Sequence, residues 1–121
     1  MQAIVVGKKL VAFCNANQPH KAVEELYADN IVSVEPDDES GGVSEGMAEL
    51  LVKHERWDSN VEVHETIARG PYTGRRQNEF AVKFDLDATP QGSERIKMEE
   101  LAFYTVEGGK VVREEFMFLN Q

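Results

Sequence analysis

A glutamate at the end of a short β-prone run is the first residue of this chain that could do chemistry. Residues 31–35 (IVSVE) are rich in β-branched side chains, and Pro36 ends the run because proline cannot donate to a β-ladder. We expect Glu35 to face an internal cavity, where burial disfavours the carboxylate, raises its pKa and makes it a general base. The acidic segment 37–39 would raise that pKa further. The alternative is a glutamate at the rim, solvated beside this segment.

A second carboxylate lies on a later predicted strand. Glu100 shares one side of that strand with Met98, Ala102 and Tyr104. If this side faces the cavity, Glu35 and Glu100 could share a proton or divide the roles of acid and base. A register shift of one residue would place Glu99 inside instead, and this alternative stays open.

Histidines and tyrosines supply further candidates. His54 could move protons near neutral pH, although a surface or interfacial role is the commoner one for a histidine. The hydroxyl of Tyr27 or of Tyr104 could donate to a developing oxyanion. Trp57 could close the mouth of the cavity or pack in the core, which is the usual place for an aromatic residue. Phe116 is a further aromatic residue that we expect to line the predicted pocket.

Metal and disulfide chemistry are not expected. No histidine pair has the HxxxH spacing of a helical metal site, and Cys14 is the single cysteine. Helical spacing with Leu10 and Val11 suggests that Cys14 is a small buried hydrophobe. We therefore predict no metal in the site.

The elements that must position these residues follow from periodicity. Apolar residues recur at helical spacing over residues 3–16 and 19–27, and again in the segment that Ser44 would cap and that ends near Trp57. After residue 60 the period changes to two, which predicts four long strands between residues 61 and 119. The predicted fold class is α+β: three helices packed on a curved mixed or antiparallel sheet that forms a cone with an internal pocket. Residues 1–121 are expected to form a single domain.

Composition narrows the class of partner. The net charge is −9, with basic residues dispersed along the chain, so neither nucleic acid nor an anionic membrane is an expected partner. No apolar run approaches the roughly 18 residues of a membrane span. The first residues have lysines inside the apolar pattern and no small-residue cleavage signal, which argues against a secretory peptide. We expect a cytoplasmic location.

At this point the chain resembles a known family. The element order, the YADN-IVSVEP run and the ending GGKVVREEFMF resemble the nuclear-transport-factor-2-like (NTF2-like) superfamily, in its branch of SnoaL-like and ketosteroid-isomerase-like proteins. The resemblance implies a cone-shaped fold, a small hydrophobic ligand and no cofactor. It also implies a choice among isomerases, cyclases, dehydratases and binding modules, because this fold hosts many functions.

The resemblance also assigns individual residues. Glu35 matches the catalytic aspartate of ketosteroid isomerases, which immediately precedes a proline. The two oxyanion donors of those enzymes are matched here by Leu10 and Ala102, which cannot donate, so strict ketosteroid isomerase activity is not expected. The remaining expected pocket residues are His54, near a family position of pocket aromatics, and the positions Val82, Phe84 and Phe118.

Three functions are therefore open. The first is cofactor-free proton transfer on a hydrophobic carbonyl compound, of isomerase, cyclase or dehydratase type, with Glu35 as base and Tyr27 or Tyr104 polarising the carbonyl. The second is non-catalytic binding of a small apolar ligand in the same cone. The third is a dimerising interaction domain. We also predict a homodimer, because Leu101 and Phe103 place apolar surface on the outer face of the sheet.

Overall fold

The structure is a computed structural model that describes residues 2–36 and 42–119. The acidic segment 37–39, which was expected to influence Glu35, lies outside the described residues. Within the described ranges the chain forms three helices and six strands, in the order α1 (Ala3–Asn15), α2 (Pro19–Leu26), β1 (Tyr27–Val34), β2 (Val43–Glu45), α3 (Met47–Asn60), β3 (Val61–Tyr72), β4 (Glu79–Pro90), β5 (Ile96–Glu107) and β6 (Lys110–Phe118).

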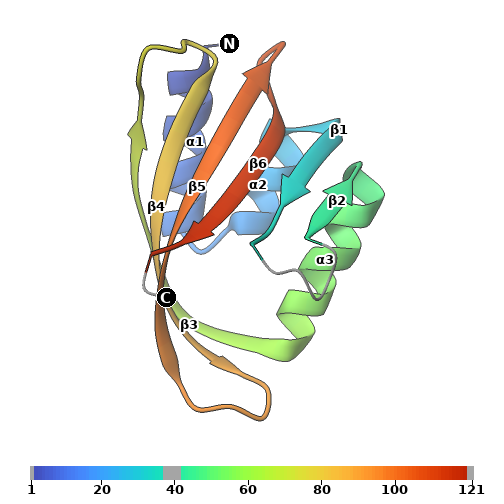
Figure 1. Ribbon diagram of the computed structural model, residues 1–121, viewed down its shortest axis with the longest axis vertical. Helices are drawn as coiled ribbons and strands as arrows, with labels where there is room; N and C mark the ends of the chain where they lie inside the picture. The colour runs from blue at the N-terminus through green and yellow to red at the C-terminus, as the bar shows by residue number, and fades with distance from the viewer. Residues whose placement is uncertain (1, 37–41, 120–121) are drawn as a thin grey trace.

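The strands form one mixed sheet in the order β2-β1-β6-β5-β4-β3. Strand β1 runs parallel to β6, and every other neighbouring pair is antiparallel. The sheet is curved and does not close into a barrel, and α1 lies against one face of its long strands while α3 follows β2 at the other end (Figure 1). The predicted α+β class and the four long strands after residue 60 are confirmed.

The start of the third helix differs from the prediction. Ser44 does not cap it, because Val43–Glu45 pair with β1 as a short strand that was not predicted. Gly46 then turns the chain with a φ of 88°, a conformation that glycine adopts without strain, and α3 begins at Met47. Glu49 fixes this turn by accepting a hydrogen bond from the backbone N–H of Glu45 (3.0 Å). Strand β1 also starts earlier than predicted, directly after α2.

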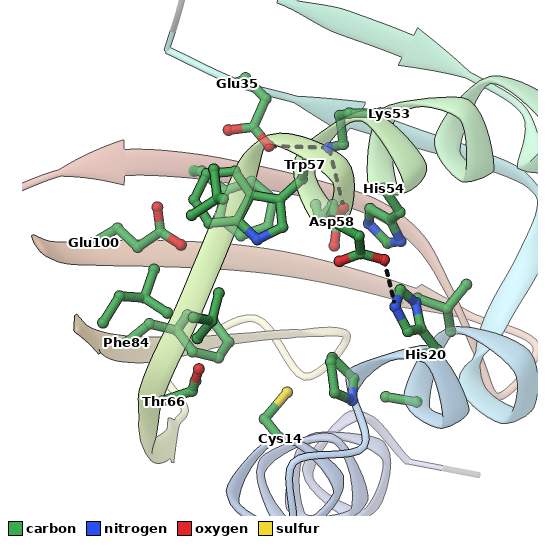
Figure 2. A pocket seen from close by; sticks show the side chains of 18 of the residues that line it. Cys14, His20, Glu35, Lys53, His54, Trp57, Asp58, Thr66, Phe84 and Glu100 are labelled. Atoms are coloured by element: carbon green, nitrogen blue, oxygen red, sulfur yellow. Dashed lines mark hydrogen bonds and ion pairs between the residues drawn. The ribbon is translucent and has the colours of Figure 1, made fainter. Parts of the chain in front are cut away.

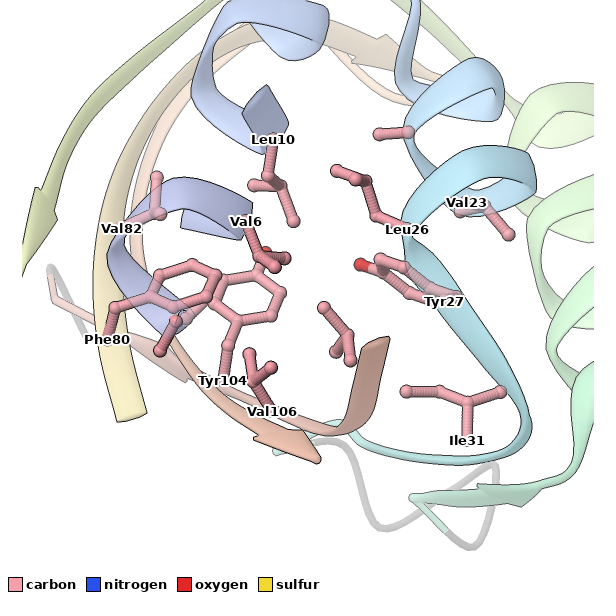
Figure 3. Packing of buried hydrophobic residues seen from close by; sticks show 14 of the residues in the cluster. Val6, Leu10, Val23, Leu26, Tyr27, Ile31, Phe80, Val82, Tyr104 and Val106 are labelled. Atoms are coloured by element: carbon pink, nitrogen blue, oxygen red, sulfur yellow. The ribbon is translucent and has the colours of Figure 1, made fainter. Parts of the chain in front are cut away.

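A hydrophobic core joins α1 and α2 to the concave face of the sheet (Figure 3). Val82 and Ala102 are fully buried in it, and the ring of Tyr104 stacks on that of Phe80 with centroids 4.8 Å apart. Helix α1 approaches β3 closely at Gly7, where an added Cβ would lie 2.8 Å from the Cβ of Pro71. This core fixes the sheet against two helices.

Candidate functional site

A hollow of about 690 Å³ lies between the helices and the long strands. Its volume is in the range of small-molecule sites, roughly 300 to 1,000 Å³. Helix α3 contributes His54 and Trp57 from above, and β4 and β5 contribute Phe84 and Glu100 from below (Figure 2). The predicted site residues that line it are Tyr27, Glu35, His54, Trp57, Phe84, Glu100, Tyr104, Phe116 and Phe118.

Two predicted pocket residues do not line the hollow. Val82 and Ala102 are paired across β4 and β5 and lie in the core under α1 and α2. They are on the predicted side of their strands, but the helices cover this end of the sheet. The expectation that they touch a ligand is therefore not supported by their position.

Glu35 follows the last residue of β1 and reaches the edge of the hollow. Its Oε1 lies 3.0 Å from Nζ of Lys53 on α3, and its side chain is 30% exposed. Lys53 also donates a hydrogen bond to Ser33 and lies 3.8 Å from Oε2 of Glu114. Glu35 is thus one carboxylate of a charged cluster at the rim, and not an isolated buried acid. Lys53 was not identified from the sequence, since a lysine in an amphipathic helix is usually solvated.

Glu100, and not Glu99, faces the hollow. Glu99 points to the other side of the sheet, where Nζ of Lys83 lies 2.6 Å from its carboxylate. Burial, followed by the negative charges of Glu35 and Glu114, raises the pKa of Glu100 to about 7 against the opposing charge of Lys53. A carboxyl group with a pKa near neutrality can carry a proton in either direction.

Tyr27 is committed to an internal hydrogen bond. Its hydroxyl donates to Glu114, which is 1% exposed and also accepts a hydrogen bond from Oγ of Ser33 (2.6 Å). Burial raises the pKa of Glu114, and burial together with the charge of Glu114 raises that of Tyr27 well above its usual value. The proton of Tyr27 is therefore not free for a ligand oxygen in this arrangement.

The sequence contained a signal for Glu114 that was not used. Phe116 and Phe118 were placed inside, and a residue two positions earlier on the same strand must share their face. A buried glutamate is costly unless it has partners. The structure supplies the partners from distant segments, Tyr27 and Ser33 on β1 and Lys53 on α3.

Tyr104 is largely a core residue that reaches the lining. It is 2% exposed, and burial raises the pKa of its hydroxyl well above the usual value. Cys14 also lines the hollow, and burial raises the pKa of its thiol to about 11, so it is a protonated thiol and not a nucleophile.

Histidines form a second polar group in the lining. Nε2 of His20 lies 2.8 Å from Oδ2 of Asp58, and the rings of His20 and His54 are 6.0 Å apart. Nδ1 of His54 is buried and has no hydrogen-bond partner among the described residues. Burial, followed by the charge of Lys53, lowers the pKa of His54 to about 4, so its ring is neutral at pH 7. His64 lies elsewhere, on β3, hydrogen-bonded to Thr89.

Among the described residues, no three His, Cys, Asp or Glu side chains are grouped so that they could hold a metal ion. In the same part of the chain, no helix is both long and apolar enough to cross a membrane. The chemistry that the lining offers is that of carboxylates, neutral histidine and apolar walls.

Comparison with known proteins decides the family. The family model described as the SnoaL-like domain matches residues 2–118. The chain belongs to the SnoaL-like family. This confirms the resemblance drawn from its sequence, whereas none of the functionally curated proteins matches it.

Solved structures place this SnoaL-like chain in the NTF2-like fold. A Mesorhizobium loti structure described as a candidate SnoaL-like polyketide cyclase is 33% identical, with a TM-score of 0.90 over 97% of this chain and 99% of that one. A candidate isomerase from Bacillus subtilis is 17% identical, with a TM-score of 0.77 over 97% and 86% of the two chains. An NTF2-like protein from Burkholderia pseudomallei is 14% identical, with a TM-score of 0.75 over 97% and 90%. The last two show a shared fold alone.

Proposed function

We propose that the hollow binds a small hydrophobic carbonyl compound and that this SnoaL-like protein catalyses cofactor-free proton transfer on it. The reaction type would be isomerisation, cyclisation or dehydration. The observation that carries the proposal is the presence of two carboxyl groups, Glu35 and Glu100, in the lining of one largely apolar hollow. Such pairs divide the roles of acid and base when their environments differ.

The two environments do differ. Glu35 forms an ion pair with Lys53 at the edge of the hollow, and in the proposal it is the group that accepts a proton from the carbon next to a carbonyl group. Glu100 has a pKa of about 7 because of burial and the neighbouring negative charges, so a large fraction is protonated at neutral pH. In the proposed reaction Glu35 removes the proton from carbon, and Glu100 donates its own proton to the carbonyl oxygen. Glu35 then gives its proton to a different carbon, and the enol hydroxyl returns its proton to Glu100, which completes an isomerisation and restores both groups.

The tyrosines are assigned a lesser role than the sequence suggested. Tyr27 donates to Glu114 and Tyr104 is only 2% exposed, so the proposal relies on neither hydroxyl. Leu10 and Ala102 supply no donor either. Protonated Glu100 takes the place of these donors in the proposal, since a neutral carboxyl group can donate a hydrogen bond to an oxyanion.

A second function is favoured by the same shortage of donors. If Glu100 does not reach the ligand, the hollow is a binding site with nothing to stabilise an enolate, and the protein is a non-catalytic module for a small apolar ligand. Titration calorimetry with α-tetralone, a bicyclic aromatic ketone, separates the two when it is combined with turnover. Replacing Glu35 with Gln should leave binding intact and lower turnover by roughly 10², the scale expected for losing a positioned base. Binding with no turnover in the unmodified protein would favour the module.

We also propose that the protein is a homodimer through the outer face of the sheet. Phe103 and Met117 are more than two-fifths exposed there, and Met117 pairs across β5 and β6 with Leu101. Covering a large apolar side chain stabilises an assembly by roughly 1.5 to 3 kcal/mol. This cluster of Leu101, Phe103 and Met117 is the proposed centre of the interface.

A further inference from the structure

Glu114 is a buried carboxyl group that the proposed reaction does not use. It lies on β6, it is 1% exposed, and it belongs to the lining of the hollow. Taking a charged group out of water costs several kcal/mol, and a buried ion pair often repays this cost only in part. Stability alone is therefore a weak reason to keep a glutamate at this position. Its neighbours connect it instead to the proposed base.

The hydrogen bonds around Glu114 run in one direction. A lysine ammonium group can only donate, so Oγ of Ser33 accepts a hydrogen bond from Lys53. The hydroxyl proton of Ser33 is then directed to Oε2 of Glu114, which lies 2.6 Å away. Tyr27 donates to Oε1, the other oxygen of the same carboxyl group. Because Ser33 and Glu114 are both fully buried, water does not compete for these bonds.

The ammonium group of Lys53 has partners on several sides. Besides its bond to Ser33, its Nζ lies 3.8 Å from Oε2 of Glu114 and 3.0 Å from Oε1 of Glu35 (Figure 2). It also lies 5.4 Å from the centre of the ring of Phe116, within the roughly 6 Å over which an aromatic face attracts a cation. Side-chain exposure falls from 30% for Glu35 to 21% for Lys53 and 2% for Glu114. The contacts thus lead from the edge of the hollow into the interior.

We propose that Glu114 and Ser33 are positioning residues that hold the ammonium group of Lys53. Lys53 in turn fixes the carboxylate of Glu35 at the place where it removes a proton from the ligand. The inference rests on the proposed function, because it takes Glu35 as the base. A lysine side chain has many rotamers, and an anchored ammonium group limits them before the ligand binds. A misplacement of about 1 Å can slow a reaction by roughly 10², so this anchor matters for the rate.

Ser33→Ala tests the anchor without changing a charge. Binding of α-tetralone is measured by calorimetry, and proton removal is measured as the rate at which the hydrogens next to its carbonyl group exchange with deuterium. Ser44→Ala is a matched control, since Ser44 lies opposite Ser33 on β2 and outside the lining of the hollow. We expect Ser33→Ala to lower the exchange rate by roughly 10-fold with little change in Kd, and Ser44→Ala to change neither.

A double variant shows whether Ser33 acts through Lys53. In a Lys53→Met background, Ser33→Ala should cause no further loss of exchange rate, because the group that it anchors is absent. A further loss as large as that in the unmodified protein would overturn the positioning role. Equal exchange rates in Ser33→Ala and Ser44→Ala would overturn it as well.

The anchor can also be measured without a ketone. If the unmodified protein does not accelerate exchange, the proposed function fails, and the proposal is then decided by NMR on the free protein labelled with ¹⁵N at lysine. The same experiment decides it if Lys53→Met does not fold. The ammonium hydrogens of Lys53 should exchange with water faster in Ser33→Ala and Glu114→Gln than in the unmodified protein or Ser44→Ala. Equal rates in all four proteins would show that Lys53 is not held, and the proposal would be wrong.

Discussion

The Nζ atom of Lys53 lies 3.0 Å from Oε1 of Glu35, so α3 and the end of β1 are joined by an ion pair beside the hollow. The same ammonium group donates to Ser33 and lies 3.8 Å from buried Glu114. Lys53 therefore sets the electrostatic environment of the carboxyl groups that face the hollow. Its positive charge lowers the pKa of Glu100, whereas burial and the charges of Glu35 and Glu114 raise it.

Replacing Lys53 with Met should raise the pKa of Glu100 above about 7, because burial and the charges of Glu35 and Glu114 would act without opposition. The measurement is a ¹³C NMR titration of the glutamate side-chain carboxyls. Lys83→Met is a matched control, since Lys83 lies on the outer face and pairs with Asp85 and Glu99. An unchanged or lower pKa of Glu100 in Lys53→Met would contradict this electrostatic account.

Glu100 should make the stability of the protein depend on pH. Its pKa is about 7 in the folded chain and near the ordinary 4.5 in the unfolded chain, so the folded state holds the proton more tightly. Stability is then fully present below pH of about 4.5 and falls as the pH rises to about 7, by up to roughly 3 kcal/mol. Glu100→Gln, which mimics the protonated form, should lack this loss.

Urea denaturation of the unmodified protein and of Glu100→Gln at about pH 5 and about pH 8 measures the effect. The variant should gain stability relative to the unmodified protein at the higher pH. Glu99→Gln, one residue away on the other face, should keep the Glu100-dependent loss. Equal pH dependence in Glu100→Gln and the unmodified protein would show that Glu100 is not the buried titrating group.

Buried Glu114 and Tyr27 should be energetically coupled. Tyr27→Phe removes a buried hydrogen bond to a carboxyl group, at an expected cost of roughly 1.5 to 3 kcal/mol in the free energy of unfolding. Glu114→Gln weakens the same bond and the contact with Lys53. The double variant should lose less than the sum of the single losses, because both remove one interaction. Chemical denaturation of the four proteins gives the coupling energy, and strict additivity would argue against the bond.

The fold was largely predictable because its strongest signals are periodic. The switch from helical spacing to alternation after residue 60 reflects amphipathic helices followed by strands with one buried face, and the structure has both. Strand β2 was missed because three residues are too few to show a period. Its formation depends on pairing with β1, which is a long-range contact.

The candidate site was predictable where the alternation of side chains along a strand alone decides which face of the sheet a residue occupies. Phe84, Phe116 and Phe118 line the hollow because they lie on the inward side of their strands. This alternation does not show which inward-facing residues are covered by helices. For that reason Val82 and Ala102 were expected in the pocket, whereas they lie in the core. The partners of Glu35 and Tyr27 were not foreseen because Lys53 and Glu114 come from other elements, 18 and 87 positions away.

The proposed dimer has its own test. Phe103 is 43% exposed on the outer face, and Phe103→Glu would place a charge at the centre of the proposed interface. We expect the variant to sediment as a monomer with its helix content unchanged by circular dichroism. Lys97→Glu, farther along the same strand, is a control that adds acidic charge away from the apolar cluster. A monomeric unmodified protein at micromolar concentration would contradict the dimer.

Proton abstraction from a bound ketone by Glu35 is the central claim, and deuterium exchange measures it most directly. α-Tetralone is incubated with the protein in deuterium oxide, and loss of the signal from the hydrogens next to its carbonyl group is followed by NMR. The unmodified protein should accelerate exchange over buffer, and Glu35→Gln should reduce that acceleration by roughly 10² while still binding the ketone. Glu115→Gln, on the outer face beside Arg113, should exchange as the unmodified protein does. Equal exchange in Glu35→Gln and the unmodified protein, or no acceleration by either, would contradict the account.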